Sequence, residues 1–182
     1  MTTLAPGYRA APVRALAQAA LMDRICVRPP YFALRDPRLE NGLFVAEAAA
    51  ELPQGLTLGP MRPGDLSRHG AIAGLCALAL RQPDDARRYY LATEATFTGH
   101  PNPAPYGSEL RFAAEVAELG KRGAKARVTA DARGARVLAL EVSYTVLSAS
   151  LFGRLHAPRR RPVVRGAFAP LPPQAVSWQG NT

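Results

Sequence analysis

The sequence has few cysteines, few histidines and no long apolar run. Two cysteines in 182 residues, Cys26 and Cys76, are too few for a disulfide framework or a cysteine-based metal site. Three scattered histidines without acids at ligand spacing do not form a metal site either. We therefore expect no metal ion, a reducing cytoplasm as the compartment, and Cys76 as a small core residue rather than a nucleophile.

No apolar stretch approaches the roughly 18 residues of a membrane-spanning helix, so no membrane span is expected. The N-terminal residues also lack the apolar segment of a signal peptide. Arg9 and Arg14, with few acids around them, leave an organellar transit peptide open as an alternative. An ordinary amphipathic helix is the favoured interpretation of this segment.

The charge is unbalanced towards arginine. The formal net charge is +9, and Lys121 and Lys125 are the only lysines. A basic chain suggests nucleic acid as a generic partner, but the basic residues are spread along the chain, and no nucleic-acid motif accompanies the tail "RLHAPRRRPVVR". Nucleic acid is thus not the expected partner. Coenzyme A or an acidic acyl carrier protein fits the charge equally well.

The length predicts one domain with flanking segments. We divide the chain into an N-terminal helical segment at 1–30, a main domain at 31–152 and a basic, proline- and arginine-rich tail at 153–182. A helix is expected over residues 10–25. Asn41-Gly42 predicts a hairpin turn, although the alanine-rich arm after it is also compatible with a helix.

The centre of the chain predicts one buried helix. "DLSRHGAIAGLCALAL" follows a loop rich in proline and glycine, and Asp65 or Ser67 is suited to cap a helix there. The helix is expected to reach about Arg81, before Pro83. It carries no charge from Ala71 to Leu80, which predicts burial on most sides.

Four strand-like segments follow the helix, each with alternating apolar residues. Short turns separate them, so we expect an antiparallel meander and an α+β fold. The segments cover residues 87–98, 108–120, 124–132 and 136–148.

Residues 43–148 resemble the hotdog fold in the order of these elements. The resemblance rests on His69-Gly70-Ala71 at the helix and on the later segments "PAPYG", "GKRGAKARV" and "DARGARVLALEV". It implies a central apolar helix wrapped by an antiparallel β-sheet. It also implies a homodimer and a substrate carried as a thioester of coenzyme A or of an acyl carrier protein, with no other cofactor.

The resemblance further implies that an acyl thioester meets the start of the central helix. Free N–H groups and positive potential there suit a developing oxyanion. Gly70 and Ala71 would let the substrate approach the backbone, and His69 would donate to the thioester oxygen or act as a base.

Neither of the usual catalytic pairs of hotdog enzymes is complete here. The acid that thioesterases carry further along the helix falls near Leu78, and the helix acid of dehydratases falls on His69. We favour an acyl-thioester hydrolase of fatty-acid or polyketide metabolism. A 3-hydroxyacyl dehydratase or isomerase, and a non-catalytic acyl-binding subunit, remain as alternatives.

Several side chains are candidates to replace the missing groups. Asp65 would orient His69 or merely cap the helix, and Glu47 would reach the site from a second subunit or be an exposed acid. The loop "GHPNPAPYG" offers further candidates for lining a pocket: His100, Asn102 and Tyr106.

Two residues of the helix and the C-terminal tail complete the list of candidates. Ser67, together with Asn102, is suited to hold a water, and Arg68 to bind a phosphate or carboxylate. His156 and the following basic residues would contact a carrier protein or coenzyme A phosphates, or form a solvated tail. These basic residues are Arg159, Arg160, Arg161 and Arg165.

Overall fold

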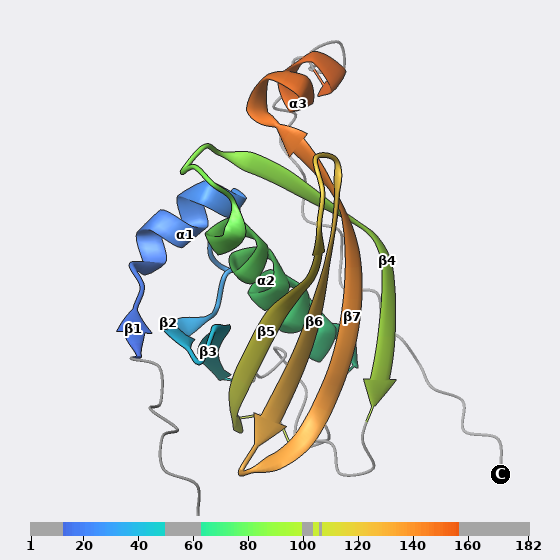
Figure 1. Cartoon of the computed structure of the whole chain (residues 1–182). Helices are drawn as coiled ribbons and strands as arrows, with labels where there is room; N and C mark the ends of the chain where they lie inside the picture. Colours follow the sequence, from blue (N-terminus) through green and yellow to red (C-terminus); the bar gives the residue numbers. More distant parts are fainter. Residues whose placement is uncertain (1–12, 50–62, 100–103, 106, 157–182) are drawn as a thin grey trace, which may run out of the picture.

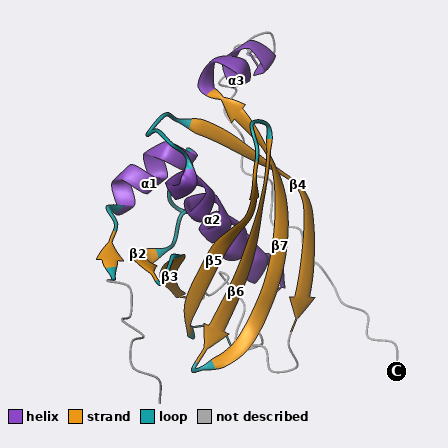
Figure 2. Cartoon of the chain, in the orientation of Figure 1, coloured by secondary structure: helices purple, strands orange, loops and turns teal. Residues whose placement is uncertain are grey.

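One antiparallel sheet curves around a central helix, as Figure 1 shows. The computed structural model describes residues 13–49, 63–99, 104–105 and 107–156. Figure 2 separates the two layers by colour, with the long helix α2 lying across the concave face of the strands. This is the α+β architecture that the order of elements predicts.

Ten elements make up the described part of the chain. In order they are β1 (Arg14–Ala15), α1 (Gln18–Ile25), β2 (Arg35–Glu40), β3 (Leu43–Ala49), α2 (Pro63–Arg81), β4 (Arg88–Gly99), β5 (Glu109–Leu119), β6 (Gly123–Ala132), β7 (Ala135–Ser148) and α3 (Ala149–His156).

The strand order β1-β2-β3-β5-β6-β7-β4 confirms only part of the predicted meander. β5, β6 and β7 are consecutive antiparallel neighbours. Leu110 of β5 pairs with Ala132 of β6, and Ala132 pairs in turn with Ala135 of β7. β4 does not pair with β5 as expected. It lies at the far edge beside β7, with register from Arg88↔Ser148 to Gly99↔Leu138. The β4–β5 connection is longer than a tight turn, and this length permits the jump across the sheet.

The hairpin predicted at Asn41-Gly42 is confirmed, and its second arm is the strand β3 rather than a helix. Both turn residues have positive φ, 52° and 81°, as a two-residue turn between twisted strands requires. In β3, Phe44, Ala46 and Ala48 are buried in alternation against the core. This period of two makes a strand of a segment whose composition also suits a helix.

The first helix differs from its predicted bounds, and α3 was not predicted. α1 begins at Gln18 instead of residue 10, because Arg14 and Ala15 pair with Leu39 and Arg38 as the short strand β1. α3 continues from β7 to His156, so the tail expected from residue 153 begins as helix. The residues after 156 lie outside the described part.

α2 begins at Pro63, two residues before the earlier of its predicted caps. Proline is favoured at a first helical position because it has no N–H to leave unpaired there. Asp65 and Ser67 therefore lie inside the helix and do not cap it. Ser67 instead donates a hydrogen bond back to the carbonyl of Gly64, at 3.2 Å.

α2 is buried along nearly its whole length, as its uncharged sequence predicts. Two glycines set how closely it approaches the sheet. A Cβ on Gly70 would lie 2.9 Å from Leu140 Cδ2, and one on Gly74 would lie 2.8 Å from the Tyr144 hydroxyl oxygen. Cys76 is fully buried in this packing, and burial raises the pKa of its thiol. It is the core residue that was expected.

Candidate functional site

The N-terminal half of α2 carries most of the described candidate residues. The first turn of a helix leaves N–H groups without partners inside the helix. Pro63 has no N–H, so in α2 these groups belong to Gly64, Asp65 and Leu66. Asp65 lies in this first turn, where a carboxylate is favoured by the helix dipole.

His69 lies deeper than the sequence suggested. It is the seventh residue of α2 and not at its mouth, and only 1% of its surface is exposed. Its ring packs against β5, with its centroid 6.1 Å from that of Phe112 and the planes inclined by 57°. The helix starts earlier than its expected caps, and this shift carries His69 into the core.

Two charged neighbours of His69 come from the same helix. Asp65 precedes it by four residues, so the two side chains share one face of α2, about 5–6 Å apart at Cβ. Arg68 Nη2 lies 3.5 Å from His69 Nε2. Because a guanidinium only donates hydrogen bonds, Nε2 is the acceptor in this contact. The helix thus brings together a carboxylate, an imidazole and a guanidinium.

Gly70 and Ala71, where the substrate was expected to approach the backbone, are enclosed by the sheet in this structure. Both lie beyond the first turn, where each helical N–H donates to the carbonyl four residues earlier. Gly70 faces Leu138 and Leu140 of β7 at close range. The carbonyl of Ala71 accepts a hydrogen bond from the Tyr144 hydroxyl, at 2.9 Å. The small residues therefore serve the packing of α2 on the sheet, and the amides of the first turn lie one to two turns earlier.

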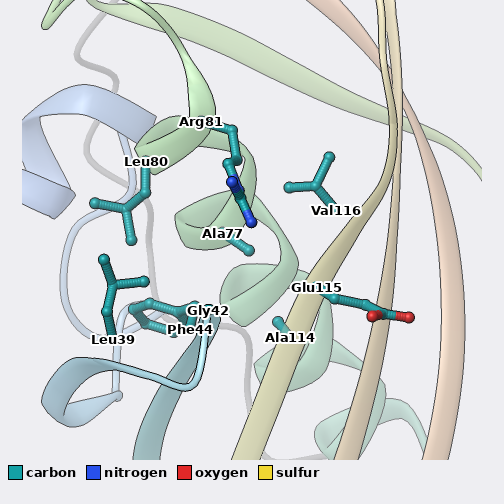
Figure 3. A pocket seen from close by; sticks show the side chains of 9 residues that line it. All are labelled: Leu39, Gly42, Phe44, Ala77, Leu80, Arg81, Ala114, Glu115 and Val116. Atoms are coloured by element: carbon teal, nitrogen blue, oxygen red, sulfur yellow. The ribbon is translucent and has the colours of Figure 1, made fainter. Parts of the chain in front are cut away.

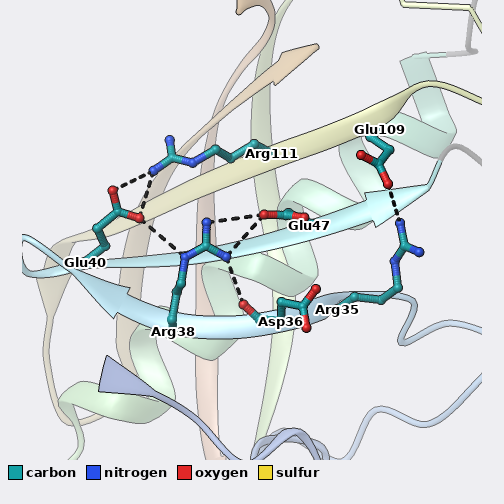
Figure 4. Close-up of polar contacts among 7 residues, drawn as sticks. All are labelled: Arg35, Asp36, Arg38, Glu40, Glu47, Glu109 and Arg111. Carbon is teal, nitrogen blue, oxygen red and sulfur yellow. Dashed lines mark hydrogen bonds and ion pairs between the residues drawn. The ribbon is translucent and has the colours of Figure 1, made fainter. Parts of the chain in front are cut away.

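Glu47 does not meet His69 within one protomer. It lies on β3 between the buried residues Ala46 and Ala48, and so on the sheet face that is turned away from α2. Figure 4 shows its carboxylate held by Arg38, whose Nη1 and Nη2 both lie 3.3 Å from Oε1. This pairing makes Glu47 part of a surface ion-pair network.

Three predicted residues cannot be placed. His100, Asn102 and Tyr106 lie outside the described residues, as do the arginines from Arg159 onward. His156 is the last residue of α3, where its ring packs on Phe152 with centroids 4.2 Å apart.

Ser108 is a polar residue that the sequence analysis missed. It immediately precedes β5, two residues before the buried Leu110, and it is 7% exposed. Its hydroxyl has no hydrogen-bond partner among the described residues. A lone serine after a glycine is typical of a turn, so only the burial distinguishes it. An unpaired buried hydroxyl is costly, which makes Ser108 a further candidate residue.

Two further properties concern the described segments as a whole. They contain no cluster of three or more histidine, cysteine or acidic side chains that would hold a metal ion. None of their helices is both long and apolar enough to cross a membrane.

Comparison with known proteins shows the fold. No protein-family model and no curated protein matches this sequence. Among solved structures, the HP0420 homologue from Helicobacter felis has a TM-score of 0.54 at 15% identity, over 72% of this chain and 93% of its own. A single-residue variant of that protein gives 0.57 at 16% identity, over 77% and 96%. A mutant of thioesterase PA1618 from Pseudomonas aeruginosa gives 0.51 at 12% identity, over 60% and 78%.

The chain therefore has the hotdog fold that the sequence predicted. A central apolar helix lies in an antiparallel sheet, and the match extends over nearly the full length of the Helicobacter protein. The fold is shared with thioesterases.

Proposed function

We propose that this protein is an acyl-thioester hydrolase that acts on thioesters of coenzyme A or of an acyl carrier protein. One observation carries the proposal: Asp65 and His69 lie one turn apart in the first half of the buried helix α2. The hotdog fold, shared with a thioesterase, supports it.

The chemistry follows from these groups. The backbone N–H groups in the first turn of α2 would stabilise negative charge on the thioester oxygen. The Asp65–His69 pair would hold a water and take its proton as the water oxygen attacks the carbonyl carbon. The carbon–sulfur bond then breaks, the proton passes to the leaving sulfur, and a carboxylic acid and a free thiol are released.

The anionic carrier would meet basic residues at the same helix. Arg68 is half-buried on α2 beside His69, and a guanidinium suits phosphate or carboxylate recognition. The net charge of +9 would favour encounter with coenzyme A or an acidic carrier protein.

We also infer that the working unit is a homodimer joined through β4. This strand forms one edge of the sheet, and each of its residues from Leu91 to Thr98 is exposed. Phe97 lies opposite the buried Leu140, on the face that holds α2, yet it remains 37% exposed. A long edge strand with an uncovered apolar face is favourable for pairing with a second copy.

A non-catalytic acyl-binding subunit is the second candidate function, and the burial of His69 favours it. A base that is 1% exposed needs a local opening or a bound substrate before a water reaches it. A binding subunit needs neither.

Hydrolysis of a panel of acyl-CoA and acyl-carrier thioesters, measured as release of free thiol, tests the proposal. We expect His69→Gln and Asp65→Asn to lower kcat by about 10²–10⁴-fold, the usual contribution of acid–base groups. Glu141→Gln is the matched control, because it changes an acid that pairs with Arg127 on the face of β7 opposite α2, and it is expected to keep full activity.

The alternatives give different results with the same proteins and substrates when binding and loss of water are measured as well. Thioester binding without turnover, unchanged in the variants, would contradict hydrolysis and favour the binding subunit. Loss of water from a 3-hydroxyacyl carrier would identify the dehydratase. Full activity in both site variants would exclude the Asp65–His69 pair.

A further inference from the structure

A second site lies at the other end of α2, in a cavity of about 170 Å³ (Figure 3). Apolar side chains from three regions line it: Leu39 and Phe44 of the β2–β3 hairpin, Ala77 and Leu80 of α2, and Ala114 and Val116 of β5. Residues 77–81 are about 12 residues beyond the Asp65–His69 pair, or about 18 Å along the helix axis. The cavity is therefore separate from the proposed catalytic groups.

The charged residues at this cavity, Arg81 and Glu115, are arranged differently. Figure 3 shows the Arg81 guanidinium extending along α2 towards Ala77, and the Glu115 carboxylate turned away. Glu115 Oε1 lies 3.8 Å from Arg127 Nη1, so its charge is partly balanced there. The mouth of the cavity is thus positive.

Arg81 forms no hydrogen bond or ion pair with any described residue. Most of the described arginines form such contacts; Arg24, for example, pairs with Asp85, and Arg88 pairs with Asp84. A guanidinium presents a planar set of donors that matches a carboxylate. An unpaired guanidinium would bind the carboxylate of a ligand, and the apolar cavity below it would bind the ligand's apolar body.

We propose that this cavity binds a small monocarboxylate whose apolar body is about the size of a benzene ring, with its carboxylate on Arg81. The volume supports this size, since apolar protein cavities of about 150 Å³ hold benzene. The apolar lining would take the ring or a short alkyl chain, and the carboxylate would remain at the mouth, close to solvent. This binding does not depend on the proposed hydrolase activity.

Titration of the full-length protein with benzoate and with hexanoate, followed by methyl NMR, tests the proposal. We expect the largest shifts at the methyl groups of Leu80 and Val116. Arg81→Gln should weaken benzoate binding by about fivefold or more, because a charge-assisted pair is lost. Benzamide, which has the ring without the charge, should bind wild type and Arg81→Gln equally.

Arg154→Gln is the matched control, since Arg154 is an exposed arginine of α3 without a described ion pair. It should bind benzoate as the wild type does. Equal benzoate affinity in Arg81→Gln would overturn the proposal. So would shifts confined to the first half of α2, or no binding of either acid at tens of millimolar. Because binding is measured, none of these results depends on thioester turnover.

Discussion

Gly74 of α2 has room for a hydrogen atom and for no larger group. A Cβ there would lie 2.8 Å from the Tyr144 hydroxyl oxygen and 3.1 Å from the Ala126 Cβ. Tyr144 is itself held in place, because its hydroxyl donates a hydrogen bond to the carbonyl of Ala71, which lies about one helical turn before Gly74. Burial also raises the pKa of this phenol, which keeps it a donor. The glycine and the tyrosine thus define one contact between helix and sheet.

We predict that Gly74→Ala destabilises the protein. Overpacking of a dense core costs about 1–3 kcal/mol, and over most of this range the cost is larger than the roughly 1 kcal/mol that alanine gains over glycine in a helix. In a Tyr144→Phe background the same change should cost less, because the nearest atom has been removed. Urea unfolding of the four proteins measures both free energies and their coupling.

Gly153→Ala is the matched control for this series. Gly153 is also helical, but a Cβ there would meet nothing within 4 Å, so the change should be neutral or stabilising. An equal cost of Gly74→Ala in both backgrounds would show that the tyrosine hydroxyl does not limit the space.

Among the elements, β2, β3 and β5 are linked by ion pairs on the face opposite α2 (Figure 4). Glu40 accepts from Arg111 Nη2 at 3.0 Å and from Arg38 Nε at 3.4 Å. The hydrogen bond from Arg111 is the main cause that lowers the pKa of the Glu40 carboxyl below its ordinary value of 4.5. The charged form is therefore favoured in the folded protein.

This shift predicts a specific acid sensitivity. A carboxyl whose pKa is lower in the folded state stabilises that state above its unfolded pKa, and the contribution is lost as the pH falls through the folded pKa. We expect the stability of the wild type to fall below about pH 4.5, and Glu40→Gln to flatten this decline. Urea midpoints between about pH 3 and 6 measure it, with Glu94→Gln on β4 as the control. An unchanged acid limb in Glu40→Gln would contradict the prediction.

Local sequence patterns predicted which helices and strands form better than they predicted which strands pair with one another. The alternation of Leu110, Phe112 and Ala114 predicted β5, and the uncharged run to Leu80 predicted a buried α2. The partner of β4 was not predicted, because strand pairing is a non-local property and a long connection permits several neighbours. Only a tight turn, such as Asn41-Gly42, determines a neighbour from the sequence.

The positions of the candidate site residues divide in the same way, into local spacing that the sequence gives and burial that depends on non-local packing. The four-residue spacing of Asp65 and His69 follows directly from helical geometry. The depth of His69 does not, because it depends on where the helix begins, and Pro63 was the available sign of that start. Ser108 and Arg81 could not be distinguished from ordinary turn and surface residues, since burial and pairing depend on packing.

At the scale of the whole molecule, we predict a dimer of twice the 19.5 kDa of one chain. Replacing Leu91 and Phe97 by lysine should produce a monomer, because like charges brought together across a shared edge repel. Light scattering coupled to size exclusion at micromolar concentration measures the mass. Leu155→Lys, on an exposed leucine of α3 (54% exposed), is the control and should stay dimeric. A monomeric wild type would contradict the prediction.

The position of β4 also affects the order in which the chain can fold. β4 is made before β5, β6 and β7, yet it pairs with the last of them, across 39 residues at Gly99↔Leu138 and 60 at Arg88↔Ser148. Closing such long loops lowers the entropy of the chain before any contact between the two strands has formed to offset this cost. On the ribosome, β4 must therefore wait for β7 to emerge. During that interval β4 is an unpaired strand edge, which favours aggregation.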